Sequence, residues 1–62
     1  MEVEVLLETF VLHGGSSSEW CYVDEINFLD EYVVLADVYD EENKKRAKID
    51  FAYIKSWRAT FD

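Results

Sequence analysis

The sequence predicts an all-β fold, a five-stranded and strongly bent antiparallel small barrel formed by residues 1–62 as one domain. Three observations predict it. Apolar and polar residues alternate with a period of two along most of the chain. β-branched and aromatic residues lie in short runs bounded by turn residues. The chain has only 62 residues, of which 50% are hydrophobic, so its sheet must curl to bury a core and to protect its edges.

The first two strands are expected on either side of a loop. Between Glu2 and Leu12, valine and leucine alternate with glutamate, which favours a strand over the competing helix. Two adjacent glycines and three serines at positions 14–18 then predict a loop between strands. A second strand follows at residues 20–28, where Asp24 interrupts the apolar face, so a bend is expected at residues 24–25.

Three further strands are predicted in the second half of the chain. The segment YVVLADVYD, residues 32–40, is rich in the β-branched and aromatic residues that strands favour. The segment RAKIDFAYI, residues 46–54, has the clearest alternation of the chain and predicts the fourth strand. A short turn at residues 55–57 leads into the fifth strand, WRATF, at residues 57–61. No segment predicts a helix convincingly.

The segment DEENKKRAK changes from acidic to basic charge and predicts a hairpin between the third and fourth strands. If residues 41–44 form its loop, Asp40 faces Lys45 and Asp37 faces Lys48. The same register adds these pairs: Tyr39 with Arg46, Val38 with Ala47, Ala36 with Ile49 and Val34 with Phe51. Hydrophobicity and charge therefore agree on one register, since a slip of one residue would exchange the two faces.

Charge is distributed unevenly in a chain whose net charge is −8. Residues 1–43 contain twelve Asp and Glu but no Lys or Arg, whereas residues 44–62 contain all six Lys and Arg. The electrostatic field of a chain with this negative net charge repels phosphate backbones and attracts basic surfaces, including those of proteins that bind nucleic acid. The sequence therefore favours a protein partner with a basic surface.

The preferred interpretation is a non-enzymatic acidic protein-binding module that inhibits or modulates such a partner. Its acidic surface would comprise Glu2, Glu4, Glu8, Glu19, Asp24, Glu25, Asp30 and Glu31. Strand alternation would space the first glutamates by about 6.6–6.8 Å per two-residue step, close to the phosphate spacing of one nucleic-acid strand. The competing interpretation is that these acids only keep a small protein soluble. Small size and acidity also suit an inhibitor encoded by a phage or mobile element.

Apolar residues exceed what one buried sheet face requires. The surplus forms a candidate apolar interface of Leu6, Phe10, Leu12, Val33, Leu35, Ile54 and Trp57. Either the barrel closes over these side chains or they contact a partner. The tryptophans and phenylalanines are most simply assigned to the core, namely Trp20, Trp57, Phe10, Phe28, Phe51 and Phe61, although Trp57 is expected to be partly exposed.

Two segments within residues 20–57 resemble the Sm-like barrel family, in particular its Hfq-like branch of bacterial RNA chaperones. The first comprises Ile26, Leu29, Asp30, Tyr32, Val33, Val34 and Leu35, and the second Ala52, Tyr53 and Ile54. In that family the first segment forms the paired second and third strands, and the second links the fourth and fifth. The resemblance implies an SH3-like or Sm-like small barrel with a tendency to form rings. The Lys-His pair that contacts RNA in that branch, the Sm-motif glycine and the N-terminal helix have no counterpart here.

The first alternative function is nucleic-acid binding by an Sm-like oligomer. Its basic residues would be Lys44, Lys45, Arg46, Lys48, Lys55 and Arg58, with Tyr39, Tyr53 or Trp57 as stacking groups. Cross-strand neutralisation and a solvated loop explain the same cations without any ligand. The second alternative is a structural subunit that self-assembles through exposed strand edges.

No catalytic site, metal site or cofactor is predicted. His13 is the only histidine, and nothing in the sequence indicates that a base, a nucleophile and an orienting acid converge. Cys21 is the only cysteine, so the chain has no internal disulfide, which is typical of the reducing cytoplasm. No apolar run approaches the roughly 20 residues of a membrane-spanning helix, so no membrane association is expected.

Overall fold

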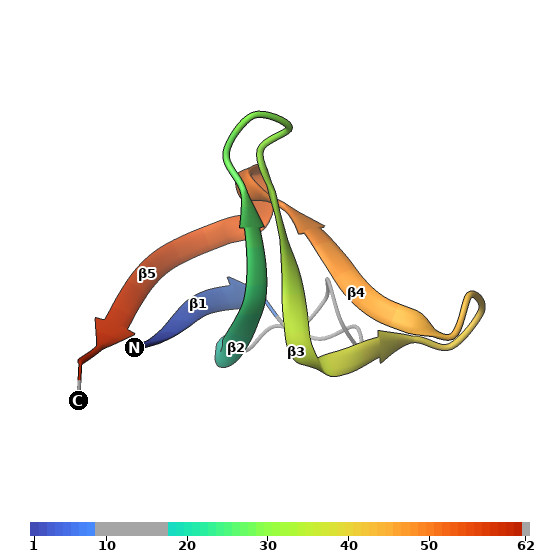
Figure 1. The fold of residues 1–62 in the computed structure, drawn as a ribbon, viewed down its shortest axis with the longest axis horizontal. Helices are drawn as coiled ribbons and strands as arrows, with labels where there is room; N and C mark the ends of the chain where they lie inside the picture. The colour runs from blue at the N-terminus through green and yellow to red at the C-terminus, as the bar shows by residue number, and fades with distance from the viewer. Residues whose placement is uncertain (9–17, 62) are drawn as a thin grey trace.

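The computed structural model describes residues 1–8 and 18–61, which contain five antiparallel strands in a single sheet (Figure 1). The strands are β1 (Glu2–Glu8), β2 (Ser18–Asn27), β3 (Tyr32–Asp40), β4 (Lys45–Asp50) and β5 (Ile54–Thr60). Their order across the sheet is β4-β3-β2-β1-β5, so the last strand returns to pair with the first. The predicted all-β, five-stranded antiparallel fold is confirmed. Within the described residues β4 and β5 are the edges of the sheet, and its closure into a barrel stays a prediction.

The core lies on one face of β1 and of the strands that curve around it. Val5 and Leu7 are fully buried, as are Val33 and Leu35 on β3. Cys21 and Ile49 complete this cluster from β2 and β4. The period-two pattern of β1 explains why Val5 and Leu7 both enter the core, because alternate side chains of a strand point to the same face. The predicted part of the first strand beyond Glu8, including Phe10 and Leu12, lies outside the described residues.

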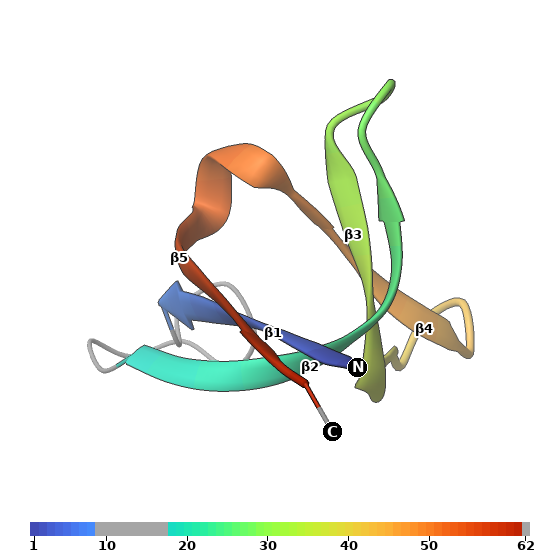
Figure 2. The same cartoon turned by 60° about the vertical axis from the view of Figure 1, so that its left-hand side comes forward.

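Strand β2 is long and bent, and it takes part in both halves of the sheet (Figure 2). Residues 18–22 pair with β1, whereas residues 23–27 pair with β3. The register shifts between Val23 and Glu25, which leaves Asp24 as an extra residue and bends the strand. The bend expected at residues 24–25 is therefore confirmed.

The end of the β3–β4 hairpin has the predicted register. Asp40 is opposite Lys45 and Tyr39 is opposite Arg46, with residues 41–44 as the turn. Lys44 adopts a left-handed φ of 56° and its N–H donates to the Asp40 carbonyl at 2.8 Å, which closes the turn. The charge switch in the sequence therefore marks a real hairpin.

Further along the same hairpin the predicted register is wrong. Val34 is opposite Lys48 and Val33 is opposite Ile49, so the expected Asp37–Lys48 pair does not form. The reason is a register shift in which residues 35–38 of β3 face a much shorter stretch of β4. These additional residues bend β3, as Figure 1 shows. The expected pairs of Ala36 with Ile49, Val34 with Phe51 and Val38 with Ala47 are likewise not among the register partners.

A single turn of 3-10 helix, η1 (Phe51–Tyr53), separates β4 from β5. The sequence pattern predicted that the fourth strand would continue to Ile54 and that a turn would follow at residues 55–57, and both predictions are wrong. Asp50 ends β4 because its side chain accepts a hydrogen bond from the Ala52 N–H at 2.9 Å. The Phe51 N–H donates instead to the Glu31 carbonyl at 2.9 Å, which fixes η1 beside the β2–β3 turn.

Candidate functional site

Among the predicted surface acids, Glu4, Glu8 and Asp24 form ion pairs with basic residues of β4 and β5. The pairs are Glu4 with Arg58, Glu8 with Lys55 and Asp24 with Arg46. Each pair joins segments that are distant in sequence. Arg46, Lys55 and Arg58, which were assigned to nucleic acid, are therefore already in ion pairs with carboxylates.

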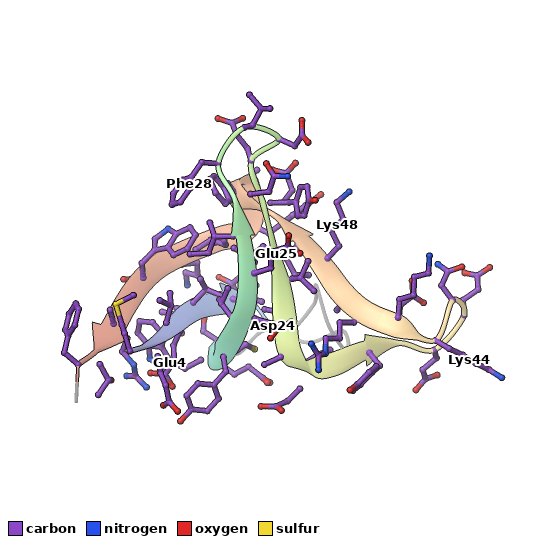
Figure 3. All side chains as sticks on the ribbon, in the orientation of Figure 1. Glu4, Asp24, Glu25, Phe28, Lys44 and Lys48 are labelled. Carbon is purple, nitrogen blue, oxygen red and sulfur yellow. The ribbon has the colours of Figure 1, made fainter. Side chains whose placement is uncertain are left out.

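Glu4 is the most enclosed of these acids, with only 9% of its surface exposed. It lies on β1 opposite Arg58 of β5, whose Nε donates to its carboxylate (Figure 3). The Arg58 Cζ also lies 4.0 Å from the centroid of the Trp20 ring, a cation–π contact. The hydrogen bond and charge of Arg58 keep the pKa of Glu4 below its ordinary value despite partial burial. Glu2, Glu4 and Glu8 were expected to mimic the phosphates of a nucleic-acid strand. Glu4, the central residue of these three, is instead enclosed and paired with Arg58.

Exposed apolar side chains gather at the turn between β2 and β3. Phe28 is 75% exposed and Leu29 is 91% exposed. Carboxylates lie on both sides of them in the sequence, with Glu25 three residues before Phe28 and with Asp30 and Glu31 directly after Leu29. Within residues 1–8 and 18–61, none of these three acids forms an ion pair. We call these five residues the acidic tip, and Figure 3 shows Phe28 at the end of the projecting hairpin.

Local hydrogen bonds determine the shape of the acidic tip. The Asp30 N–H donates to the Asn27 side-chain oxygen at 2.8 Å, an arrangement that favours a tight turn. Glu31 then adopts a left-handed φ of 57°, which returns the chain into β3. Asn27 also donates from its side chain to the Tyr32 hydroxyl at 3.2 Å. These contacts favour the observed turn although the apolar side chains of the tip are exposed.

Aromatic contacts attach the acidic tip to the body of the domain. The Phe28 ring packs edge to face with Phe51 of η1, with ring centroids 6.1 Å apart. Phe51 in turn packs edge to face with Trp57 of β5 at 5.3 Å. Trp57 is 42% exposed, so this aromatic row runs from the tip to a partly exposed indole. Edge-to-face pairs of this kind favour one ring arrangement over others.

A second surface feature is a groove of about 870 Å³ beside the β3–β4 hairpin, which we call the basic groove. Its polar lining includes Lys45, Arg46, Lys48, Tyr32 and Tyr39. Its apolar lining is Val34, Val38, Ala47 and Ile49. The acids Asp40 and Glu41 lie at its turn end. The register shift of β3 accounts for the groove, because the bent strand separates from β4 between its paired ends.

The cations of the basic groove differ in how far they are already engaged. Arg46 contacts Asp24, and its hydrogen bond to Tyr39 is the main cause of a raised guanidinium pKa. The Lys48 ammonium lies 4.1 Å from the centroid of the Tyr32 ring. Lys45 lines the groove and has no ion pair within the described part of the chain. The adjacent Lys44 also lacks one there, but it does not line the groove.

The candidate apolar interface is divided by the structure. Val33 and Leu35 belong to the core, so the sheet covers them. Leu6 and Ile54 are half-buried and Trp57 is partly exposed. Phe10 and Leu12 lie outside the described residues. Sequence reasoning missed Phe28 and Leu29 as surface residues, although two adjacent large apolar residues between Asn27 and Asp30 were a signal of an apolar turn.

Cys21 is buried beside Glu19, and both burial and that carboxylate affect its thiol. Burial is the main cause that raises the Cys21 pKa to about 11, and the Glu19 charge and hydrogen bond add to the shift. The thiol is therefore protonated at neutral pH and is a poor nucleophile. In the described residues no three His, Cys, Asp or Glu side chains are grouped as metal ligands. His13 lies outside those residues.

Comparison with known proteins gives no match. No family model, no curated protein and no solved structure matches this chain. In residues 1–8 and 18–61 no helix is long and apolar enough to cross a membrane. The candidate surfaces are therefore interpreted from their own residues.

Proposed function

We propose that this chain is a non-enzymatic protein-binding module whose acidic tip docks on a basic surface of a partner protein. The observation that carries the proposal is the exposure of Phe28 and Leu29 between carboxylates without ion pairs in the described structure. Exposed large apolar residues with a polar rim are typical of protein interaction sites. Glu4, Glu8 and Asp24 are engaged in ion pairs within the fold, whereas no cation of the described residues pairs with the carboxylates of the tip.

The two kinds of side chain in the tip have different roles in this proposal. Its carboxylates steer the encounter with a basic partner and lose influence as salt screens them. Phe28 and Leu29 then supply the apolar contact that slows dissociation. The Asn27–Asp30 turn and the Phe28–Phe51 contact fix the tip before binding, which reduces the entropy lost on docking.

The partner's basic surface is proposed to be one that also binds nucleic acid in the cytoplasm. A chain with a net charge of −8 competes with nucleic acid for such a surface. Occupation of that surface would make the chain an inhibitor or modulator of its partner. An origin in a phage or mobile element fits such an activity.

Affinity capture from a nuclease-treated lysate tests the apolar part of the tip. Wild-type protein should recover a basic protein, and the Leu29→Ser and Phe28→Ser variants should each recover at least several-fold less. Phe61→Ser is the matched control because Phe61 is 74% exposed at the other end of the chain. Recovery by the tip variants equal to that by Phe61→Ser would overturn the proposal.

The acidic part of the tip is tested in the same capture with a charge reversal. Asp30→Lys combined with Glu31→Lys should lose the basic protein, because the reversed charges repel it. Glu41→Lys combined with Glu42→Lys is the matched control, since it makes the same change of net charge in the other turn. Equal loss in both double variants would mean that only the overall charge matters, and not the tip.

A second candidate function is nucleic-acid binding, in line with the Sm-like resemblance. The observation that favours it is the basic groove, which combines Lys45, Arg46 and Lys48 with Tyr32 and Tyr39. This candidate also includes closure of the sheet into an Sm-like barrel and assembly of that barrel into an oligomer. A gel-shift assay at low salt tests it, and the combination of Lys45→Glu and Arg46→Glu should abolish any shift.

A further inference from the structure

We propose that the acidic tip of one copy docks into the basic groove of another, so that the chain associates with itself head to tail. The inference rests on the proposed function, because it uses the tip as the docking element, and it adds a second copy as a partner. Two features of one chain carry the inference: an apolar tip whose carboxylates have no ion pair within the described residues, and an apolar groove with cations.

The two surfaces match in their apolar parts. The tip presents Phe28 and Leu29, and the groove has a lining of Val34, Val38 and Ala47 beside Ile49. The groove volume of about 870 Å³ is within the range of about 300–1,000 Å³ in which proteins enclose a small ligand. It can therefore accept two adjacent apolar side chains.

The two surfaces also match in charge. Lys45 has no ion pair within the described residues, and Lys48 contacts only the Tyr32 ring among the interactions found there. Asp30 and Glu31 of a second copy would supply the missing counter-charges. The carboxylate of Asp40, at the turn end of the groove, already accepts hydrogen bonds from the turn, including one from the Asn43 side chain at 2.9 Å.

The occupant of the groove must be another copy, not the tip of the same chain. The tip leads directly into Tyr32, and β3 itself lines the groove. Folding the tip back into its own groove would break the β2–β3 hairpin. Figure 3 shows Phe28 and Lys44 at the ends of two hairpins that project in different directions. Because the two contacting surfaces differ, the association is heterologous and forms either a ring or an open chain.

Self-association of this kind would also regulate the proposed function. A tip held in a neighbouring groove is not available to a partner, so binding of a basic partner and assembly exclude each other. Each copy has a net charge of −8, which opposes assembly through long-range repulsion. A partner with a more basic surface would therefore displace the second copy.

Sedimentation equilibrium with two charge-reversed variants tests the contact. The reversed-tip variant carries Asp30→Lys and Glu31→Lys, and the reversed-groove variant carries Lys45→Glu and Lys48→Glu. Wild-type protein should show a weight-average mass that rises with concentration to at least twice 7.3 kDa. Each variant alone should stay at the monomer mass, because its tip and groove then repel each other. An equimolar mixture should regain association, because each tip then meets a groove of opposite sign.

A pair of adjacent lysines gives the matched control. Lys45→Glu should weaken association at least several-fold, whereas Lys44→Glu should leave it close to wild type, since only Lys45 lines the groove. Far-ultraviolet circular dichroism checks that all variants are folded. If a double variant does not fold, the comparison of Lys45→Glu with Lys44→Glu still tests whether the groove forms the contact.

Three results would overturn the inference: a wild-type mass of 7.3 kDa at every concentration, association of the reversed-groove variant alone, or no association in the mixture. The reversed-groove variant also separates this inference from the proposed function. If it still captures the basic partner while wild-type protein never self-associates, only the second-copy contact is wrong. If the tip variants capture the partner as wild type does, the proposed function is wrong.

Discussion

Arg58 donates a hydrogen bond to the carboxylate of Glu4, although the two residues are 54 positions apart. The contact joins the last strand to the first and lies against the Trp20 ring. It shows that part of the chain's acidity serves the fold. The acidic tip, by contrast, has carboxylates that no described cation neutralises.

The Glu4–Arg58 contact predicts a specific dependence of stability on pH. Hydrogen bonding to Arg58 lowers the Glu4 pKa from an ordinary 4.5, so ionised Glu4 stabilises the folded state above that pH. This contribution is lost as the pH falls through the lowered pKa. Urea unfolding should therefore show wild-type stability decreasing on acidification, with Glu4→Gln less stable at neutral pH and less sensitive to acid. Glu2→Gln is the control, and an equal effect of both changes would contradict the assignment.

Leu35 and Leu29 are predicted to respond very differently to truncation. Leu35→Ala should lower the free energy of unfolding by about 2–5 kcal/mol, because a fully buried side chain leaves a cavity. Leu29→Ala should change it by no more than about 0.5 kcal/mol, because that side chain is almost wholly exposed. Urea denaturation measures both values. Similar costs for the two variants would mean that Leu29 is packed in the folded protein.

The buried thiol of Cys21 should be unreactive in the folded protein. Its pKa is raised from 9.0 to about 11, mainly by burial, so the thiolate is scarce at neutral pH. Alkylation by iodoacetamide should be at least tenfold slower in native than in urea-unfolded protein. The protonated thiol favours the folded state below pH 9.0, and that advantage is lost as pH rises towards about 11. Equal alkylation rates in the two states would contradict the burial of Cys21.

A double-mutant cycle distinguishes the structural register of the β3–β4 hairpin from the register predicted by charge. Asp24→Asn and Arg46→Gln should show measurable coupling in stability, because these side chains form an ion pair. Asp37→Asn and Lys48→Gln should show none, because the register shift separates them. Coupling between Asp37 and Lys48 instead would support the unshifted hairpin.

Local patterns predicted the strands well, but not all of the contacts between them. The bounds of β3 agree with the segment 32–40, because its β-branched and aromatic residues form a continuous strand signal. The bend at Asp24 could be predicted because an acidic residue interrupts the apolar face of the strand. The register shift between Val34 and Tyr39 could not be predicted, since counting from the turn assumes equal numbers of residues on both strands.

The candidate site was predicted only in part, for a physical reason. Glu25, Asp30 and Glu31 were identified from charge, but their sequence positions did not distinguish them from acids with ion pairs. The partners of Glu4 and Glu8 come from β5, and such long-range pairs depend on the assembled sheet. Phe28 was assigned to the core because an aromatic residue usually gains by burial, whereas the turn after Asn27 leaves it exposed.

The most direct test of the central claim is an amide chemical-shift titration of the isotope-labelled chain with the basic protein that it captures. The largest shifts are expected at residues 25–31, because the acidic tip forms the contact. Shifts centred on Glu2, Glu4 and Glu8, or on residues 44–48, would contradict this expectation.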